Sequence, residues 1–282
     1  MMPDPIAIVG AVVLALVVSG AVAGIAGRFG RVASDLGRIV AVGAGFYLGC
    51  GWLGIVPRWS IREDMDRLLS LVMPAVLIVE VVEALPGRPR WLVRMGRLVV
   101  AGLGAPVLLR GSVYLSTSWT PTFAVLVFVA IGAVEAMEWS LVTQRGTDFS
   151  LSIAMAIIIG AASLSNALSG YLGAGEAGMV LSASVLGGSV ARSRSIGVAI
   201  VGLASLLTIG HFFGGLSADH AATLAAAPML AWATGLSRLP ATARGVLRVA
   251  LVAAVAAGVV ADAGRRFVEA GGLAVAAGAE GP

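Results

Sequence analysis

The sequence predicts an all-α protein, a polytopic bundle of about ten transmembrane helices with no sizeable soluble domain. Of the 282 residues, 59% are hydrophobic and only 12% are charged, whereas a soluble domain is about one quarter charged. The apolar residues form long runs, which satisfy their backbone hydrogen bonds within a membrane only as helices. An outer-membrane barrel would instead alternate polar and apolar positions, and the sequence shows no such alternation.

The positions of the helices follow from the breaks between the apolar runs. A crossing needs about 20 apolar residues, so short loops must join the helices into one membrane domain over residues 1–282. The breaks carry arginine clusters, short polar runs and turn-forming prolines such as Pro57, Pro121 and Pro240. The predicted spans are 6–27, 39–56, 68–85, 98–115, 122–142, 149–172, 177–191, 195–216, 221–236 and 246–262.

The distribution of basic residues predicts the orientation. All 19 are arginines, and most of them fall in every second loop. By the positive-inside rule these loops are cytoplasmic, which places the N-terminus outside. The loop containing Arg58, Arg62 and Arg67 is the main exception, and Arg265 and Arg266 also lie on the outer side. Arginine in place of every lysine, with abundant Ala and Gly, indicates a genome rich in G and C, so we expect a bacterial plasma membrane.

The first apolar run has an alternative interpretation as a signal peptide. Ala21-Val22-Ala23 resembles a cleavage site, but the residues before the run include Asp4 and no positive charge. We therefore expect this segment to remain as the first helix. Cys50 is the only cysteine, so an intrachain disulfide cannot form.

The residues that are missing exclude several kinds of chemistry. Without lysine the chain has no Walker A lysine, Schiff base or Ser-Lys dyad. The zinc-protease pattern His-Glu-x-x-His is absent, because His211 and His220 are the only histidines. The glycines of 49–54 have dinucleotide-binding spacing but end a hydrophobic span instead of joining a strand to a helix. We predict no cofactor, no catalytic residue and, because the arginines are dispersed, no nucleic-acid partner.

Two predicted spans carry glutamate pairs within apolar sequence. Glu80 and Glu83 lie in the third span, and Glu135 and Glu138 lie in the fifth. The i, i+3 spacing places both carboxylates of a pair on one helix face. Both spans run from outside to inside, so the pairs lie at a similar depth near the cytoplasmic side. Since a carboxylate is costly within a bilayer, we expect a shared acidic site for a cation or protons if the two helices are neighbours.

The same glutamates have a structural explanation. Glu83 and Glu138 lie near the ends of their spans and could reach headgroup water. Arg110 lies near the outer end of the fourth span, so it is not their partner and is expected to snorkel. Arginines of the adjoining loops could pair with these carboxylates: Arg88, Arg90 and Arg145.

Other polar residues lie in the sixth and eighth spans. Ser163 and Asn166 belong to a stripe of small and polar residues on one face of the sixth span. Such a face commonly lets helices pack closely, and the alternative is a solute path lined by hydroxyls and Asn166. We expect His211, in the eighth span, to be hydrogen-bonded; two histidines and Asp219 would be a thin set of metal ligands.

Glycine pairs four residues apart predict close helix packing, either within one bundle or between copies in an oligomer. The clearest pairs are Gly20 with Gly24, Gly45 with Gly49, and Gly210 with Gly214.

Two functions from different classes remain open. The number of spans and the paired carboxylates favour a permease for a small solute or cation. The small-residue faces favour a non-transporting membrane subunit or scaffold. An intramembrane hydrolase that uses Ser163 or Ser165 with His211 is a more distant alternative, because no nucleophile motif surrounds either serine. The expected partners are the lipid bilayer and a small solute or cation.

Overall fold

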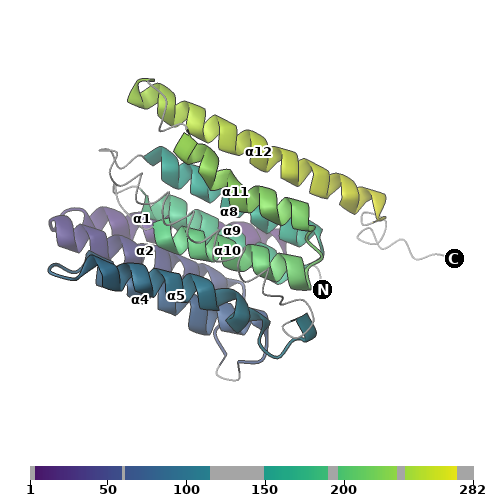
Figure 1. Ribbon diagram of the computed structural model, residues 1–282, viewed down its shortest axis with the longest axis horizontal. Coiled ribbons are helices and arrows are strands. Elements are labelled where there is room, and N and C mark those ends of the chain that lie inside the picture. The colour runs from purple at the N-terminus through teal and green to yellow at the C-terminus, as the bar shows by residue number, and fades with distance from the viewer. Residues whose placement is uncertain (1–3, 59–60, 115–148, 190–195, 234–238, 272–282) are drawn as a thin grey trace.

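The computed structural model describes residues 4–58, 61–114, 149–189, 196–233 and 239–271, and every regular element within them is a helix. Most of the helices run along a common direction in one bundle (Figure 1). In chain order they are α1 (Pro5–Ala26), α2 (Arg31–Trp52), α3 (Asp64–Arg67), the π-helix η1 (Leu68–Val72), α4 (Met73–Ala84), α5 (Arg90–Leu109), α8 (Phe149–Leu168), α9 (Leu172–Gly188), α10 (Ile196–Phe213), α11 (Ala218–Ala233) and α12 (Ala241–Glu269).

Three of these helices, α1, α8 and α12, are long and apolar enough to cross a membrane. A shorter apolar stretch, Gly197–Phe213, lies in α10. Every predicted span except the fifth overlaps a helix of the described residues. The fifth, 122–142, lies outside them. The all-helical, membrane-compatible class is therefore confirmed, while the count of ten crossings and their orientation stay predictions.

The first two helices form a hairpin whose local signals are clear. Pro5 occupies the first turn of α1, where its missing N–H has no partner to lose, and Asp4 Oδ1 accepts a hydrogen bond of 2.9 Å from the Ile6 N–H. Gly30, with φ +94°, precedes α2 in a backbone conformation that favours glycine. The hairpin also packs against α9, which is distant in sequence.

The segment from α3 to α4 is irregular because of Pro74. In η1 the Met73 N–H bonds to the Leu68 carbonyl, which is the i→i+5 pattern of a π-helix. The next donor in that pattern would be residue 74, but proline has no N–H, so the Leu69 carbonyl lacks its partner within the helix. Tyr47 of α2 replaces that partner, its hydroxyl donating to the Leu69 carbonyl oxygen at 2.6 Å.

The remaining helices surround α8. This helix contacts α9, α10, α11 and α12, and α10 also packs against α4 and α5 (Figure 1). The buried core is built from residues such as Met73, Met155, Ile158 and Ile209. Glu80 lies on α4, and α4 contacts three other helices: α2, α5 and α10.

Candidate functional site

Glu80 is the buried carboxylate of the predicted acidic site. Its relative exposure is 1%, on a helix that is otherwise almost wholly apolar. Packing of α4 against α2, α5 and α10 removes this side chain from solvent. A carboxylate in such surroundings is retained only where its interactions or its function offset the cost of desolvation.

Glu83, one turn further along α4, has a different environment. Its side chain is 21% exposed, and its Oε1 lies 3.8 Å from Nη2 of Arg88. Arg88 also donates to two carbonyls at the end of α4, those of Val82 at 2.7 Å and Leu85 at 3.1 Å. Glu83 therefore lies at the end of its helix beside a loop arginine, as expected if its role is structural. Glu80, on the same helix, is buried.

The other half of the predicted acidic site, Glu135 and Glu138, lies outside the described residues. A shared site of four carboxylates therefore stays a prediction. Of the two pairs, the structure places only Glu80 and Glu83.

Asn166 lies fully buried between α8 and α10. Its Nδ2 donates to the Leu206 carbonyl of α10 at 2.9 Å, whereas its Oδ1 has no hydrogen-bond partner among the residues that the structure describes. The amide group lies so close to the backbone of Gly210 that a Cβ at position 210 would collide with it. Asn166 thus joins two helices at a point where only glycine fits opposite.

Ser163 acts in the packing of α8 against α9. Its hydroxyl donates to the Ile159 carbonyl in its own helix at 2.6 Å, and its side chain lies directly against Gly178. A second hydroxyl crosses the same interface, since Ser182 of α9 donates to the Ala156 carbonyl of α8 at 2.7 Å. These hydroxyls satisfy backbone carbonyls and allow the two helices to approach closely.

His211 completes the turn at the end of α10. Its Nδ1 lies 2.8 Å from the Leu216 carbonyl oxygen, so Nδ1 carries the proton and donates. The chain reverses here through Gly215, with φ +70°. His211 is hydrogen-bonded, and the described residues contain no group of three or more His, Cys, Asp or Glu side chains that could hold a metal ion.

A contact that the sequence did not reveal ties α3 to the connection between α8 and α9. The Tyr171 hydroxyl donates to the Asp64 carboxylate, with distances of 2.8 Å to Oδ1 and 2.7 Å to Oδ2. Burial, then the hydrogen bond and negative charge of Asp64, raise the pKa of Tyr171 above its ordinary value, so the phenol remains a donor. The polar sequence around Asp64 identified a loop, but nothing in it indicated this partner.

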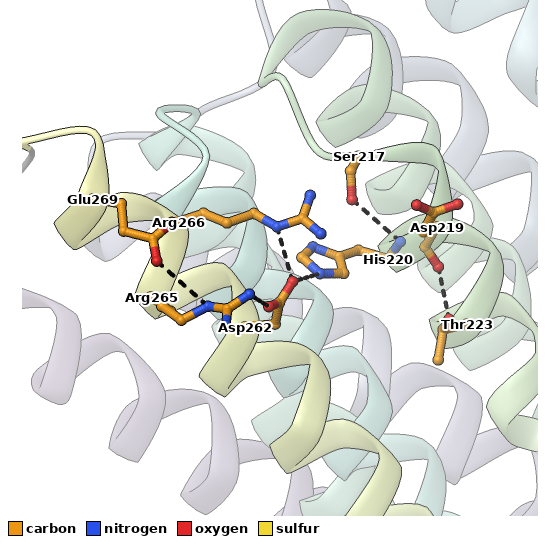
Figure 2. A network of polar contacts seen from close by, with 8 residues as sticks. All are labelled: Ser217, Asp219, His220, Thr223, Asp262, Arg265, Arg266 and Glu269. Atoms are coloured by element: carbon orange, nitrogen blue, oxygen red, sulfur yellow. Dashed lines mark hydrogen bonds and ion pairs between the residues drawn. The ribbon is translucent and has the colours of Figure 1, made fainter.

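A second polar network joins α11 to α12 (Figure 2). Asp262 of α12 lies at its centre: Oδ2 is 2.9 Å from Nε2 of His220 and 2.8 Å from Nε of Arg266, and Oδ1 is 2.9 Å from Nη2 of Arg265. At the other end of α12, the buried Arg248 donates to Ser150 of α8 at 3.0 Å. Polar contacts therefore fix α12 near both of its ends.

Comparison of the chain with models of protein families, with curated proteins and with solved structures found no match. Function is therefore inferred from the geometry of the chain itself.

Proposed function

We propose that the protein is a multi-pass permease of a bacterial plasma membrane that moves a small cation, or a small solute together with protons. Glu80 is its acidic group on the cytoplasmic side of the bundle. In the full proposal Glu80 works with Glu135 of the fifth predicted span, at the same predicted depth.

The burial of Glu80 carries the proposal. Ionisable side chains within membrane helices are costly and most often mark an ion or proton pathway. Glu80 is 1% exposed, whereas Glu83 is partly exposed near the end of the same helix. The two glutamates thus provide a functional candidate and a matched control on one helix.

Flux in proteoliposomes tests this function. Purified protein is reconstituted with a pH-sensitive dye inside the vesicles, and proton or cation movement is followed after a pH or ion gradient is applied. We expect Glu80→Gln to reduce the flux at least about tenfold, as for the loss of a group that binds the transported ion. Glu83→Gln should leave the flux within about twofold of the wild type, since an edge ion pair contributes little. Equal fluxes for the wild type and Glu80→Gln would contradict the proposal.

A scaffold function is the second candidate, and a different observation favours it. Hydroxyls and glycines of α1, α2 and α9 meet so closely that the interface serves packing, as at Gly45, where a Cβ would lie 2.5 Å from Ser19 Oγ. A rigid bundle of this kind suits a membrane subunit that holds partners in place. Absence of flux from folded wild-type protein, together with co-purification of a stoichiometric membrane partner, would favour this function.

The hydrolase alternative finds no support in the described residues. Ser163 donates to the carbonyl of its own helix, and His211 donates to the Leu216 carbonyl. Among the described residues, the buried Ser165 Oγ has no hydrogen-bond partner, so neither serine makes the hydrogen bond to His211 that joins a nucleophile to its base.

A further inference from the structure

α3 is bonded to two segments that are distant in sequence. Asp64, at its first residue, accepts the hydroxyl of Tyr171 from the connection between α8 and α9. Arg67, at its last residue, donates through Nη1 to the Leu108 carbonyl near the end of α5 at 3.0 Å. Asp64 is only 8% exposed although it belongs to a polar segment between predicted spans. The contacts therefore hold α3 against the body of the bundle.

The position of α3 along the bundle follows from its neighbours. Tyr47 of α2 bonds to Leu69 of η1, and Gly43 of α2 faces Leu77 of α4, so the two segments run antiparallel. From the Tyr47 level, Cys50 lies about 4.5 Å further along α2, and Met65 lies about 6 Å further in the same direction, at 1.5 Å per residue. α3 thus lies at the level of Cys50, which is 0% exposed and belongs to the same apolar cluster as Met65.

We propose that α3 is a latch at the end of the bundle that we predict to face outside. The hydrogen bond between Tyr171 and Asp64 holds it closed, and its release opens the interior at Cys50 to solution. The helix has four residues, of which Met65 is the one apolar side chain in the core. Its polar contacts therefore contribute a large share of its attachment.

The latch does not depend on what the protein transports. A hydrogen bond to an ionised carboxylate is among the stronger hydrogen bonds in proteins, and the Tyr171 hydroxyl has both oxygens of Asp64 within reach. Substituting Tyr171 by Phe or Asp64 by Ala removes the bond while leaving the apolar contact of Met65 in place.

Reactivity of the native Cys50 tests the latch directly. Purified protein in detergent is treated with a hydrophilic maleimide, which reaches both ends of the bundle. Wild-type Cys50 should label slowly, and Tyr171→Phe and Asp64→Ala should each label about tenfold faster, as for the loss of a charge-assisted hydrogen bond. The double variant should label no faster than either single variant, because both substitutions remove one bond.

Tyr114→Phe is the matched control. Tyr114 contacts the rings of Phe212 and Phe213, each with a centroid distance of 5.7 Å, and its hydroxyl has no hydrogen-bond partner in the described part of the chain. Its labelling rate should equal that of the wild type. Hydrogen exchange gives an independent measure: Tyr171→Phe should speed exchange in 63–69 and leave α12 unchanged. A wild-type labelling rate for Tyr171→Phe, equal acceleration by Tyr114→Phe, or multiplicative rates in the double variant would each overturn the latch.

Discussion

The group α1, α2 and α9 and the segment α3–η1–α4 are held in the bundle by different means. In the first, small side chains bring backbones together: Gly45 of α2 lies against Ser19 and Ala15 of α1 and Ser184 of α9. In the second, side chains reach across to backbone and carboxylate groups, as Tyr47 does to Leu69 and Tyr171 does to Asp64. The first is regular helix, and the second contains a π-helix and a proline.

This difference predicts where each region tolerates change. Close helix contact leaves no room for an added atom, because a tightly packed interior cannot absorb extra volume without displacement. The irregular segment depends on single hydrogen bonds, which can be removed one at a time and restored by a second substitution. The buried carboxylate of Glu80 also lies in the α3–η1–α4 segment. Functional groups commonly occur near irregular helical turns such as its π-helix.

Gly45→Ala should show the largest effect on stability. Its Cβ would lie 2.5 Å from Ser19 Oγ, 2.7 Å from the Ala15 carbonyl and 3.1 Å from Ser184 Oγ. We expect a loss of about 1–3 kcal/mol from overpacking, measured as a lower midpoint of thermal unfolding in detergent. Gly51→Ala, in the same helix but with nothing within 4 Å, is the control and should be neutral or slightly stabilising. Equal effects at the two glycines would remove the distinction between the regions.

Tyr47→Phe should lower stability by a comparable or smaller amount, and a second substitution should restore part of that loss. The substitution leaves the Leu69 carbonyl without its donor, and an unsatisfied buried acceptor costs about 1–3 kcal/mol. Pro74→Ala returns an N–H to the helix, so it should recover part of the loss in the Tyr47→Phe background. The recovery is measured by comparing the midpoints of thermal unfolding of four proteins: the wild type, Tyr47→Phe, Pro74→Ala and the double variant. If the effects of Tyr47→Phe and Pro74→Ala on stability are simply additive, Pro74 is not the reason that the Leu69 carbonyl needs the Tyr47 hydroxyl.

The smallest expected effect is the pH dependence of stability that arises from the hydrogen bond between Tyr171 and Asp64. Its pKa in the folded protein is raised above the unfolded value of about 10. Stability from this shift is therefore fully present below pH about 10 and is lost as the pH rises through the raised value. Wild-type stability should fall above pH 10 relative to Tyr171→Phe, and the difference between them should stay constant from pH 7 to 9. Parallel curves at all pH values would show that the phenol does not titrate differently on folding.

The sequence by itself determined the helical class, the approximate places of the helices and the presence of a carboxylate at position 80 within apolar sequence. These properties depend on neighbouring residues, since hydrophobicity and helical periodicity are local. The helix ends were less accurate: α2 begins at Arg31 and α12 spans Ala241–Glu269, both beyond the predicted spans. Charged residues interrupt an apolar run without ending the helix that contains it.

Only the tertiary structure decided which polar groups meet. Tyr171 and Asp64 are 107 positions apart, and His220 and Asp262 are 42 apart. Their pairing depends on the order in which whole helices pack and on the rotation of each helix about its axis. The residues next to each partner in the sequence do not specify that arrangement. The same holds for Glu80 and Glu83: the sequence placed both on one helix face, and packing by α2, α5 and α10 left one buried and the other partly exposed beside Arg88. Burial is a property of the assembled bundle, because neighbouring helices supply the atoms that exclude water.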